Sequence, residues 1–211
     1  MHQQVRDFIN YVKRNFPNYF ANVKVLDFGC GDINGNNREY FVDSEYTGND
    51  VADGPNVDLV CKTKDLLFSN ENFDTIISTE CLEHDAEYTQ SLQKAYDMLK
   101  VGGMLVFTCA STGRREHGTR RTTPNDCLAT LSGDADFQDY YKNLTIEDVI
   151  KCIDLNQFSY WRSYYNMATC DLYFVGIKGS GEVSVPPNYT DPWVKHTTID
   201  PASLEEEELV A

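Results

Sequence analysis

A glycine-rich turn and an acidic residue after it are the first features of this sequence that could do chemistry. Gly29, Gly31 and Gly35 follow the apolar stretch Val25–Phe28. Glycines at the end of a strand let the backbone approach a ligand closely. Asp50 ends the next apolar stretch, about twenty residues later, where a carboxylate can accept hydrogen bonds from a ribose. Together they indicate a site for a ligand that contains a nucleoside.

The spacing of the glycines bears on which nucleoside cofactor fits. The dinucleotide fingerprint Gly-x-Gly-x-x-Gly needs its third glycine at position 34, but Asn34 stands there and Gly35 comes one residue late. This register disfavours a nicotinamide-dependent reductase or epimerase without removing it. S-adenosylmethionine also carries an adenosine ribose, so it is the other candidate. A binding module that keeps the fold without turnover stays open as well.

Two histidines and a group of arginines are candidates for chemistry on a second substrate. His84 follows an apolar stretch, and an imidazole with a pKa near neutrality can act as a general base, although it could equally cap or pack its loop. His117 lies in Arg114–Arg121, where four arginines run against the acidic charge of the chain and could hold an anionic or hydroxyl-rich acceptor. The predicted catalytic residues are His84 and His117, and the predicted acceptor contacts are Arg114, Arg115, His117, Tyr140 and Tyr141.

Apolar periodicity predicts the elements that position these residues. Strands are expected at 23–28, 46–50, 57–61, 73–79, 104–110, 158–165 and 171–177. Helices are expected at 2–16, at 88–100 with Gly102-Gly103 as the stop signal, and at 146–155 with Thr145 and Asp148 as a capping box. Strands that alternate with helices indicate an α/β fold with a parallel sheet.

Composition shifts divide the chain into parts. Residues 1–178 carry the periodic elements and are expected to form one domain. Residues 111–143 have little periodicity, which is long for a connection, and we expect this segment to face the substrate. Residues 179–211 are acidic and rich in Gly and Pro, a composition typical of a disordered tail.

The overall charge excludes some classes of partner. A formal net charge of -15 disfavours binding to DNA or RNA through phosphates. No apolar run approaches the roughly twenty residues of a membrane span. The start of the chain has no basic stretch followed by an apolar one, and the seven cysteines show no C-x-x-C spacing, so we expect a reducing, cytoplasmic location. Asp134 and Asp136 are typical of a turn, and no metal requirement is predicted. The sequence gives no indication of oligomeric state.

Four segments in order resemble class I S-adenosylmethionine-dependent methyltransferases, in particular the broad group labelled type 11. They are Val25–Gly31, Tyr46–Asp50 with Val57-Asp58, Phe73–His84 (FDTIISTECLEH) and Leu99–Val106 (LKVGGMLV), and the resemblance covers roughly residues 22–178. It implies a Rossmann-like three-layer sandwich with a seven-stranded, mostly parallel sheet whose last strand is antiparallel. It also implies S-adenosylmethionine as the methyl donor and a small-molecule acceptor, for example a hydroxyl or amine of a sugar or glycan.

The same resemblance assigns cofactor contacts. Gly29 and Gly31 would line the methionine moiety, Asp50 would hold the ribose hydroxyls, Asp65 would reach the adenine amine, and Glu80 would lie near the methionine amino group. The chain departs from the commonest pattern at Ile33, where the group more often has a third glycine. The full predicted set is Asp27, Gly29, Cys30, Gly31, Asn34, Asp50, Val51, Asp65, Leu66 and Glu80.

Overall fold

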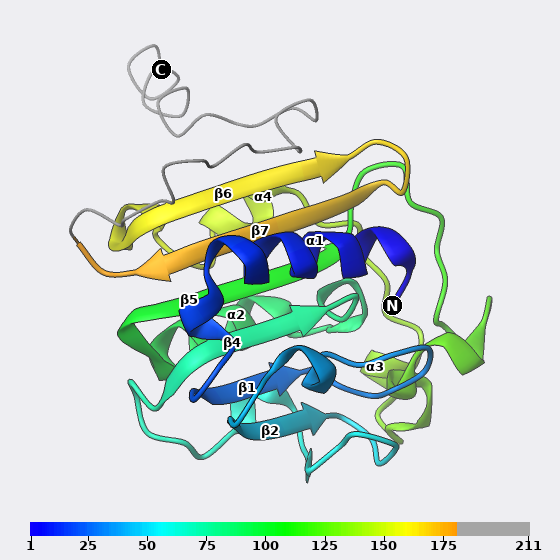
Figure 1. Ribbon diagram of the computed structural model, residues 1–211. Coiled ribbons are helices and arrows are strands. Elements are labelled where there is room, and N and C mark those ends of the chain that lie inside the picture. Colours follow the sequence, from blue (N-terminus) through cyan, green and yellow to red (C-terminus); the bar gives the residue numbers. More distant parts are fainter. Residues whose placement is uncertain (181–211) are drawn as a thin grey trace.

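A seven-stranded sheet forms the centre of the computed structural model, which describes residues 1–180 (Figure 1). The strand order is β3-β2-β1-β4-β5-β7-β6, and all neighbouring pairs are parallel except those made by β7, which is antiparallel to β5 and β6. The strands are β1 Lys24–Phe28, β2 Glu45–Asp50, β3 Leu59–Val60, β4 Phe73–Thr79, β5 Leu99–Ala110, β6 Phe158–Asn166 and β7 Asp171–Lys178. The predicted fold class is therefore confirmed.

The apolar runs of the central strands are buried on both faces of the sheet. Leu26 of β1 and Ile76 of β4 are partners in register and belong to one core, while Val25 and Ile77 belong to the core on the opposite face. Successive residues of a strand point to opposite faces, so a continuous apolar run needs helices on both sides. This requirement explains the three layers.

Helices cover the two faces unequally within residues 1–180. α1 (Gln3–Asn15) packs on one face, where Phe8 stacks on Tyr173 of β7 with 4.8 Å between ring centroids. α2 (Tyr88–Met98) and α4 (Ile146–Ile150) cover the other face, as Figure 1 shows. The short helix α3 (Ala135–Gln138) lies beyond the carboxyl ends of the parallel strands. None of the described helices is long and apolar enough to cross a membrane.

The structure corrects several predicted boundaries. α2 ends at Met98, not at Lys100, because Leu99 already pairs with Phe73 of β4, so Gly102-Gly103 lies inside β5 and does not stop the helix. β3 has two residues where five were predicted. Within the described residues, no α-helix connects β1 to β2 or β2 to β3: the first crossover is a loop with the 3-10 turn Arg38–Tyr40, and the second is a loop without helical turns.

The helix after residue 145 is capped as predicted but is shorter. The Asp148 carboxylate accepts a hydrogen bond from the Thr145 N–H at 3.0 Å, which confirms the capping box. α4 nevertheless ends at Ile150. Asp154 then accepts from the Asn156 N–H and begins a separate 3-10 turn, Leu155–Gln157. Ile146, Val149, Ile153 and Leu155 are therefore buried without forming one helix, and Ile150 is exposed. The predicted tail, except for Gly179 and Ser180, lies outside the described residues.

Replacing Phe8 tests the packing of α1. Its ring is fully buried against the sheet, so Phe8→Ala is expected to lower the free energy of unfolding by about 3–5 kcal/mol. Asn10→Ala, at an exposed position of the same helix, is the control and is expected to change it by less than about 0.5 kcal/mol. Urea denaturation measures both, and equal effects would show that α1 is not packed as described.

Candidate active site

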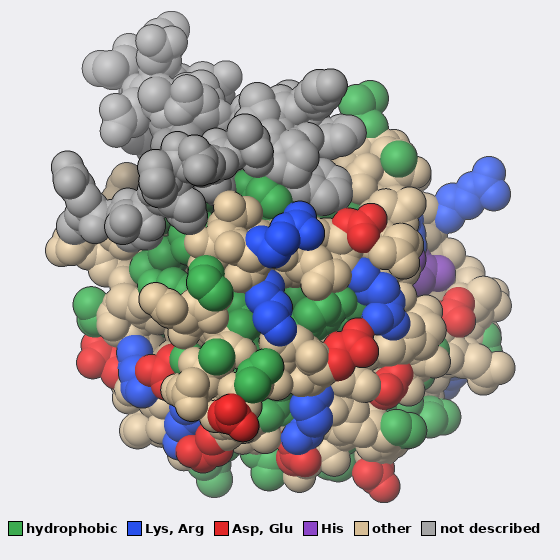
Figure 2. All heavy atoms as spheres, viewed as in Figure 1, with side chains coloured by type: hydrophobic (Ala, Val, Ile, Leu, Met, Phe, Trp, Pro, Cys, Tyr) green, Lys and Arg blue, Asp and Glu red, His purple; other side chains and the backbone are tan. Residues whose placement is uncertain are grey.

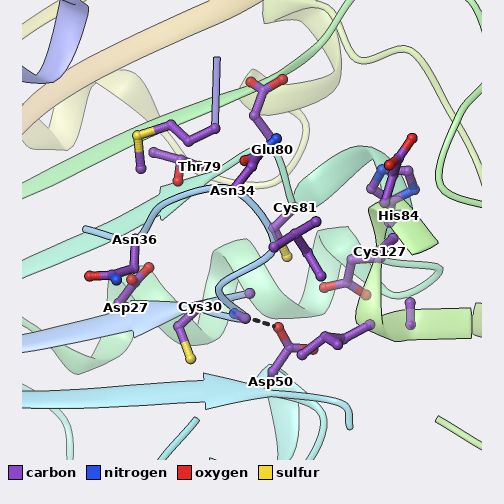
Figure 3. A pocket seen from close by; sticks show the side chains of 18 of the residues that line it. Asp27, Cys30, Asn34, Asn36, Asp50, Thr79, Glu80, Cys81, His84 and Cys127 are labelled. Carbon is purple, nitrogen blue, oxygen red and sulfur yellow. Dashed lines mark hydrogen bonds between the residues drawn. The ribbon is translucent and has the colours of Figure 1, made fainter. Parts of the chain in front are cut away.

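A cavity of about 270 Å³ opens at the carboxyl ends of β1, β2 and β4 (Figure 3). The predicted site residues that line it are Asp27, Gly29, Cys30, Gly31, Asn34, Asp50, Val51, Glu80, His84, Arg114 and His117. Asp65, Leu66, Arg115, Tyr140 and Tyr141 are not among the lining residues. The structure therefore brings the glycine turn, the acidic residue of β2 and the two histidines to one place.

The turn after β1 makes one wall of this cavity, and it has no room for side chains. Gly29 has φ +69°, and a Cβ built there would lie 2.1 Å from Cys81 Sγ. A Cβ on Gly31 would lie 2.3 Å from a methyl carbon of Leu128 and 3.1 Å from Asp50 Oδ2. Glycine is needed at both positions because neighbouring side chains already fill that space.

The rest of the turn is closed by Asp32. Its carboxylate accepts from the Gly35 N–H at 2.7 Å and from the Asn36 side-chain amide at 2.7 Å. These hydrogen bonds, with the one from Asn36 foremost, hold the pKa of Asp32 below its usual value. The Asp32-Ile-Asn-Gly35 sequence thus forms an ordered turn in place of one with a third glycine at position 33.

Asp50 ends β2 and faces the glycine turn. Its Oδ2 accepts from the Gly31 N–H at 3.0 Å, the bond drawn in Figure 3, and its Oδ1 accepts from the Val51 N–H at 2.7 Å. Burial raises the pKa of Asp50, and these backbone N–H groups act in the opposite sense. The carboxylate is fixed at the cavity with acceptor capacity left, since two oxygens offer about four acceptor positions.

Asp27 lies deeper, below the turn. It is fully buried and accepts hydrogen bonds from the Tyr46 hydroxyl and from the Asn37 side-chain amide. Burial raises its pKa to about 7, although both hydrogen bonds favour the charged form. Asn37 also donates to Thr79 Oγ1, so Asp27 ties the turn to the end of β4.

The end of β4 carries an ion-pair cluster that sequence reasoning missed. His2 Nε2 lies 2.9 Å from Asp171 Oδ2 and 3.4 Å from Glu80 Oε2, and Thr108 donates to Glu80 Oε1. Burial alone would lower the pKa of His2, but hydrogen bonds to Asp171 and Glu80 outweigh it and raise the pKa to about 9. One histidine just before a helix carries no signal of this role in the sequence.

His84 lies in a different environment. It is 4% exposed, and its ring packs edge-on against His117 with 5.1 Å between centroids and beside Tyr141 at 5.5 Å. Burial, followed by the neighbouring His117, lowers the pKa of His84 to about 3. The expectation that its pKa lies near neutrality is wrong, because the ring is removed from water. His84 is a neutral hydrogen-bonding group at the cavity wall.

The arginines after β5 are mostly engaged with acids of the same segment. Arg120 pairs with Asp139 at 2.6 Å, and Arg121 pairs with Glu116 at 2.8 Å. Arg114 lines the cavity and also binds Asp171 at 3.3 Å. The interpretation of four arginines as one clamp is therefore wrong, since at least two of them satisfy neighbouring carboxylates outside the cavity.

The remaining predicted residues lie beside the cavity. Arg115 is exposed, and its carbonyl accepts from the Tyr141 hydroxyl at 3.1 Å, so Tyr141 supports the loop of His117. Leu66 is buried in the hydrophobic core. Thr63, from the same 3-10 turn as Asp65, lines the cavity and donates to the side chain of Asn49. Residues 126–129 and Phe137 complete the opposite wall. Sequence reasoning did not single them out, although they lie in the segment 111–143 that it expected to face the substrate.

The His2 ion-pair cluster predicts a pH dependence of stability. The folded-state pKa of His2 is above the unfolded value of 6.5, so its contribution is fully present below pH 6.5 and is lost as pH rises through about 9. His2→Gln is expected to destabilise the protein more at about pH 6 than at about pH 9.5 in urea denaturation. A destabilisation that does not change with pH would contradict the ion pairs.

Solved structures share this fold at low sequence identity. Phosphoethanolamine N-methyltransferase 2 of Haemonchus contortus is 15% identical with a TM-score of 0.56, and the match covers 83% of this chain and 53% of that one. The 1,6-didemethyltoxoflavin-N1-methyltransferase of Burkholderia thailandensis is 17% identical with a TM-score of 0.54, covering 84% and 83%. The [4+2]-cyclase SpnF is 14% identical with a TM-score of 0.52, covering 83% and 82%. This chain thus spans about half the length of the first of these.

A sequence comparison gives the family. Comparison with proteins of curated function finds no match. A family model described as a methyltransferase domain matches residues 1–133, well over half of the chain. The matched part contains β1 with its glycine turn, β2 with Asp50, β4 and the three histidines that line the cavity. The protein therefore belongs to the methyltransferase domain family.

Proposed function

We propose that the protein transfers a methyl group from S-adenosylmethionine to a small-molecule acceptor. The observation that carries this proposal is the cavity in which Gly29 and Gly31 lie against Asp50, in a chain of the methyltransferase domain family. S-adenosylmethionine would supply a methyl group on a positively charged sulfur, which is already activated for transfer. The protein then has to bind, orient and exclude water.

The residues of the cavity fit this donor. Asp50 would accept hydrogen bonds from the ribose hydroxyls, and the turn at Gly29 and Gly31, which packs closely on Cys81 and Leu128, would line the donor with its backbone. Thr63 lines the cavity from the turn that also holds Asp65, which supports an adenine position there. Asp27, Cys30, Asn34, Val51 and Glu80 complete the proposed donor contacts, while Asp65 and Leu66 stay predictions.

The acceptor would occupy the side of the cavity formed by His84, His117 and Arg114. These are hydrogen-bonding groups, and they favour a polar acceptor such as a hydroxyl or amine of a sugar or glycan. His84 has a pKa of about 3 and would orient the acceptor as a neutral group. Basic and acidic side chains are interspersed on the face shown in Figure 2, and the net charge is -15, both of which disfavour a nucleic acid as the acceptor.

Two other functions compete with this one. A nicotinamide-dependent reductase would also use Asp50 for a ribose, but the register of the glycines disfavours it. The structural similarity to the cyclase SpnF favours keeping a second alternative, a protein that uses the fold without transferring a methyl group. Cofactor binding tests the first alternative, and an acceptor screen tests the second.

Removing the Asp50 carboxylate tests donor binding. Hydrogen bonds to a charged group contribute roughly 1.5–3 kcal/mol each, so Asp50→Ala is expected to weaken binding of S-adenosylmethionine and S-adenosylhomocysteine by at least about tenfold. Asp53→Ala removes the same charge at an exposed position and is the matched control. Isothermal titration, with NAD and NADP in parallel, measures both variants. Tighter binding of NAD or NADP would overturn the proposal.

An acceptor screen tests the transfer itself. The purified protein, given methyl-labelled S-adenosylmethionine, is expected to label at least one sugar or amine in a panel of small molecules and to leave DNA and RNA unlabelled. The Asp50→Ala variant is expected to lower this labelling at limiting donor concentration. Donor binding without labelling of any class would instead favour the function without methyl transfer.

A further inference from the structure

The carboxyl group of Glu83 is buried beside the cavity without a cation. Glu83 is 0% exposed, and within residues 1–180 neither carboxylate oxygen has a hydrogen-bond partner of good geometry. The nearby base Lys142 is turned away, since its ammonium group binds Asp148 and Tyr88. A buried carboxyl group in this state requires a proton or a cation.

Two imidazole groups complete a cluster around it. One nitrogen of His84, one nitrogen of His117 and one carboxylate oxygen of Glu83 all lie within 4.8 Å of one another. His84 Nδ1 is buried and has no partner among the described residues. His117 Nδ1 lies 3.1 Å from the Arg115 carbonyl, and a proton held there leaves Nε2 free as an acceptor. With the His84 proton on Nε2, the cluster offers two imidazole lone pairs beside the Glu83 carboxylate.

The chain brings His117 to this place through Gly118. Gly118 has φ +61°, and a Cβ on it would lie 2.6 Å from His84 Cε1. Any side chain at position 118 would push the loop away from the His84 ring. Tyr141 packs on both rings, with centroids 5.5 Å from His84 and 5.2 Å from His117. The close contact between the two histidines is thus maintained by Gly118 and by the packing of Tyr141.

A second cluster of similar geometry shows what a satisfied arrangement looks like. In His2, Glu80 and Asp171, one ligand atom of each side chain also lies within 4.8 Å of the other two. There the histidine carries the positive charge, with a pKa of about 9, and bridges the two carboxylates at 3.4 and 2.9 Å. In the Glu83 cluster neither imidazole pairs with the carboxylate, because both Glu83 oxygens lack a hydrogen-bond partner among residues 1–180. Both clusters have the spacing for a metal ion, but within the described residues the Glu83 cluster is the one of the two without an internal ion pair.

We propose that Glu83, His84 and His117 bind one divalent first-row transition-metal ion. Two imidazoles and a carboxylate are a donor set suited to Zn²⁺, Fe²⁺ or Co²⁺ more than to Mg²⁺ or Ca²⁺. Such an ion lies about 2.0–2.2 Å from each ligand atom, which needs ligand atoms roughly 3–3.5 Å apart. The cluster closes to this size by a shift of His117, because Glu83 and His84 are held by burial whereas His117 is partly exposed.

The ion would face the acceptor side of the cavity. This placement extends the proposed function and rests on it. His84 and His117 both line the cavity, so the coordination positions not taken by protein point toward bound molecules. A hydroxyl group bound to such an ion loses its proton to solvent more readily. This favours a hydroxyl acceptor, whose proton must leave when the methyl group is transferred.

Cobalt binding to the full-length protein tests the site without any methyl acceptor. After treatment with a chelator, the protein is titrated with Co²⁺ and followed by visible absorption and by isothermal titration. We expect one equivalent with a spectrum of nitrogen and oxygen ligands and no thiolate charge-transfer band, which the seven cysteines would otherwise produce. Zn²⁺ is expected to displace the bound Co²⁺.

Variants of two ligands decide whether this cluster is the site. Glu83→Gln and His117→Ala are each expected to weaken Co²⁺ binding by at least about tenfold. His196→Ala, a histidine outside the described residues, is the control and is expected to leave it unchanged. Circular dichroism checks the fold, and if Glu83→Gln does not fold, the partly exposed His117 decides the question.

The proposal is overturned if the wild-type protein binds no Co²⁺, if His117→Ala binds it as tightly, or if the ligands are thiolates. Titration with S-adenosylhomocysteine alone, in the absence of metal, reports separately on the proposed function. Metal binding without S-adenosylhomocysteine binding would support the metal site and contradict the proposed methyl donor. S-adenosylhomocysteine binding without metal binding would support the donor and contradict the metal site.

Discussion

The backbone hydrogen bonds between the turn after β1 and the end of β2 are the constraint on which the cavity depends. Gly29 N–H and Cys30 N–H both donate to the Asn49 carbonyl, at 2.8 and 3.1 Å, and Gly31 N–H donates to the Asp50 carboxylate. Three consecutive donors are satisfied by the end of the neighbouring strand. Because the turn cannot move away from β2 without losing them, the space beside Asp50 is formed by the protein alone. Pre-formed sites of this kind avoid the cost of ordering a loop on binding.

Around this space the protein gathers more buried acids than buried bases. Burial raises the pKa of Asp27, Asp50, Glu83 and Asp85, all on the carboxyl side of the sheet. Each would be stabilised in its ionised form by positive charge in the cavity. The proposed donor carries a positive sulfur and the proposed ion is a dication, so both proposals agree with the electrostatics of the site. His2 and Arg114, which both line the cavity and pair with Asp171, are the positive charges that the chain itself provides there.

Sequence patterns predicted the strands better than the polar contacts. β4 was predicted with its bounds because an apolar run between polar segments must be buried on both sides, and a strand can satisfy that only inside a parallel sheet. Gly102-Gly103 was misread because a glycine pair ends a helix in most settings, whereas here the pairing of Leu99 with β4 had already ended it. Tertiary pairing overrides a local signal of this kind.

Local sequence signals were also insufficient for those parts of the site that depend on tertiary packing. Asp50 and the glycines could be predicted because the ends of parallel strands meet at one edge of the sheet. His2 could not, because it reaches the cavity only when α1 packs on the sheet and brings it to Asp171, far away in the sequence. The ion pairs of the arginines in 114–121 could not be read from the sequence, because Asp139 lies 19 residues from Arg120 and Asp171 lies 57 residues from Arg114. The low pKa of His84 depends on burial, which no short motif encodes.

The position of α1 has a thermodynamic consequence. The helix covers one face of the sheet, and His2 at its amino end lines the cavity. A ligand that binds only when this segment is folded must stabilise the segment by its own binding free energy, through linkage. The amide protons of α1 would then exchange with solvent more slowly in the presence of such a ligand, although most of the helix never touches it. Ligand binding in the cavity is in this way coupled to the local stability of α1, including the part of the helix far from the cavity.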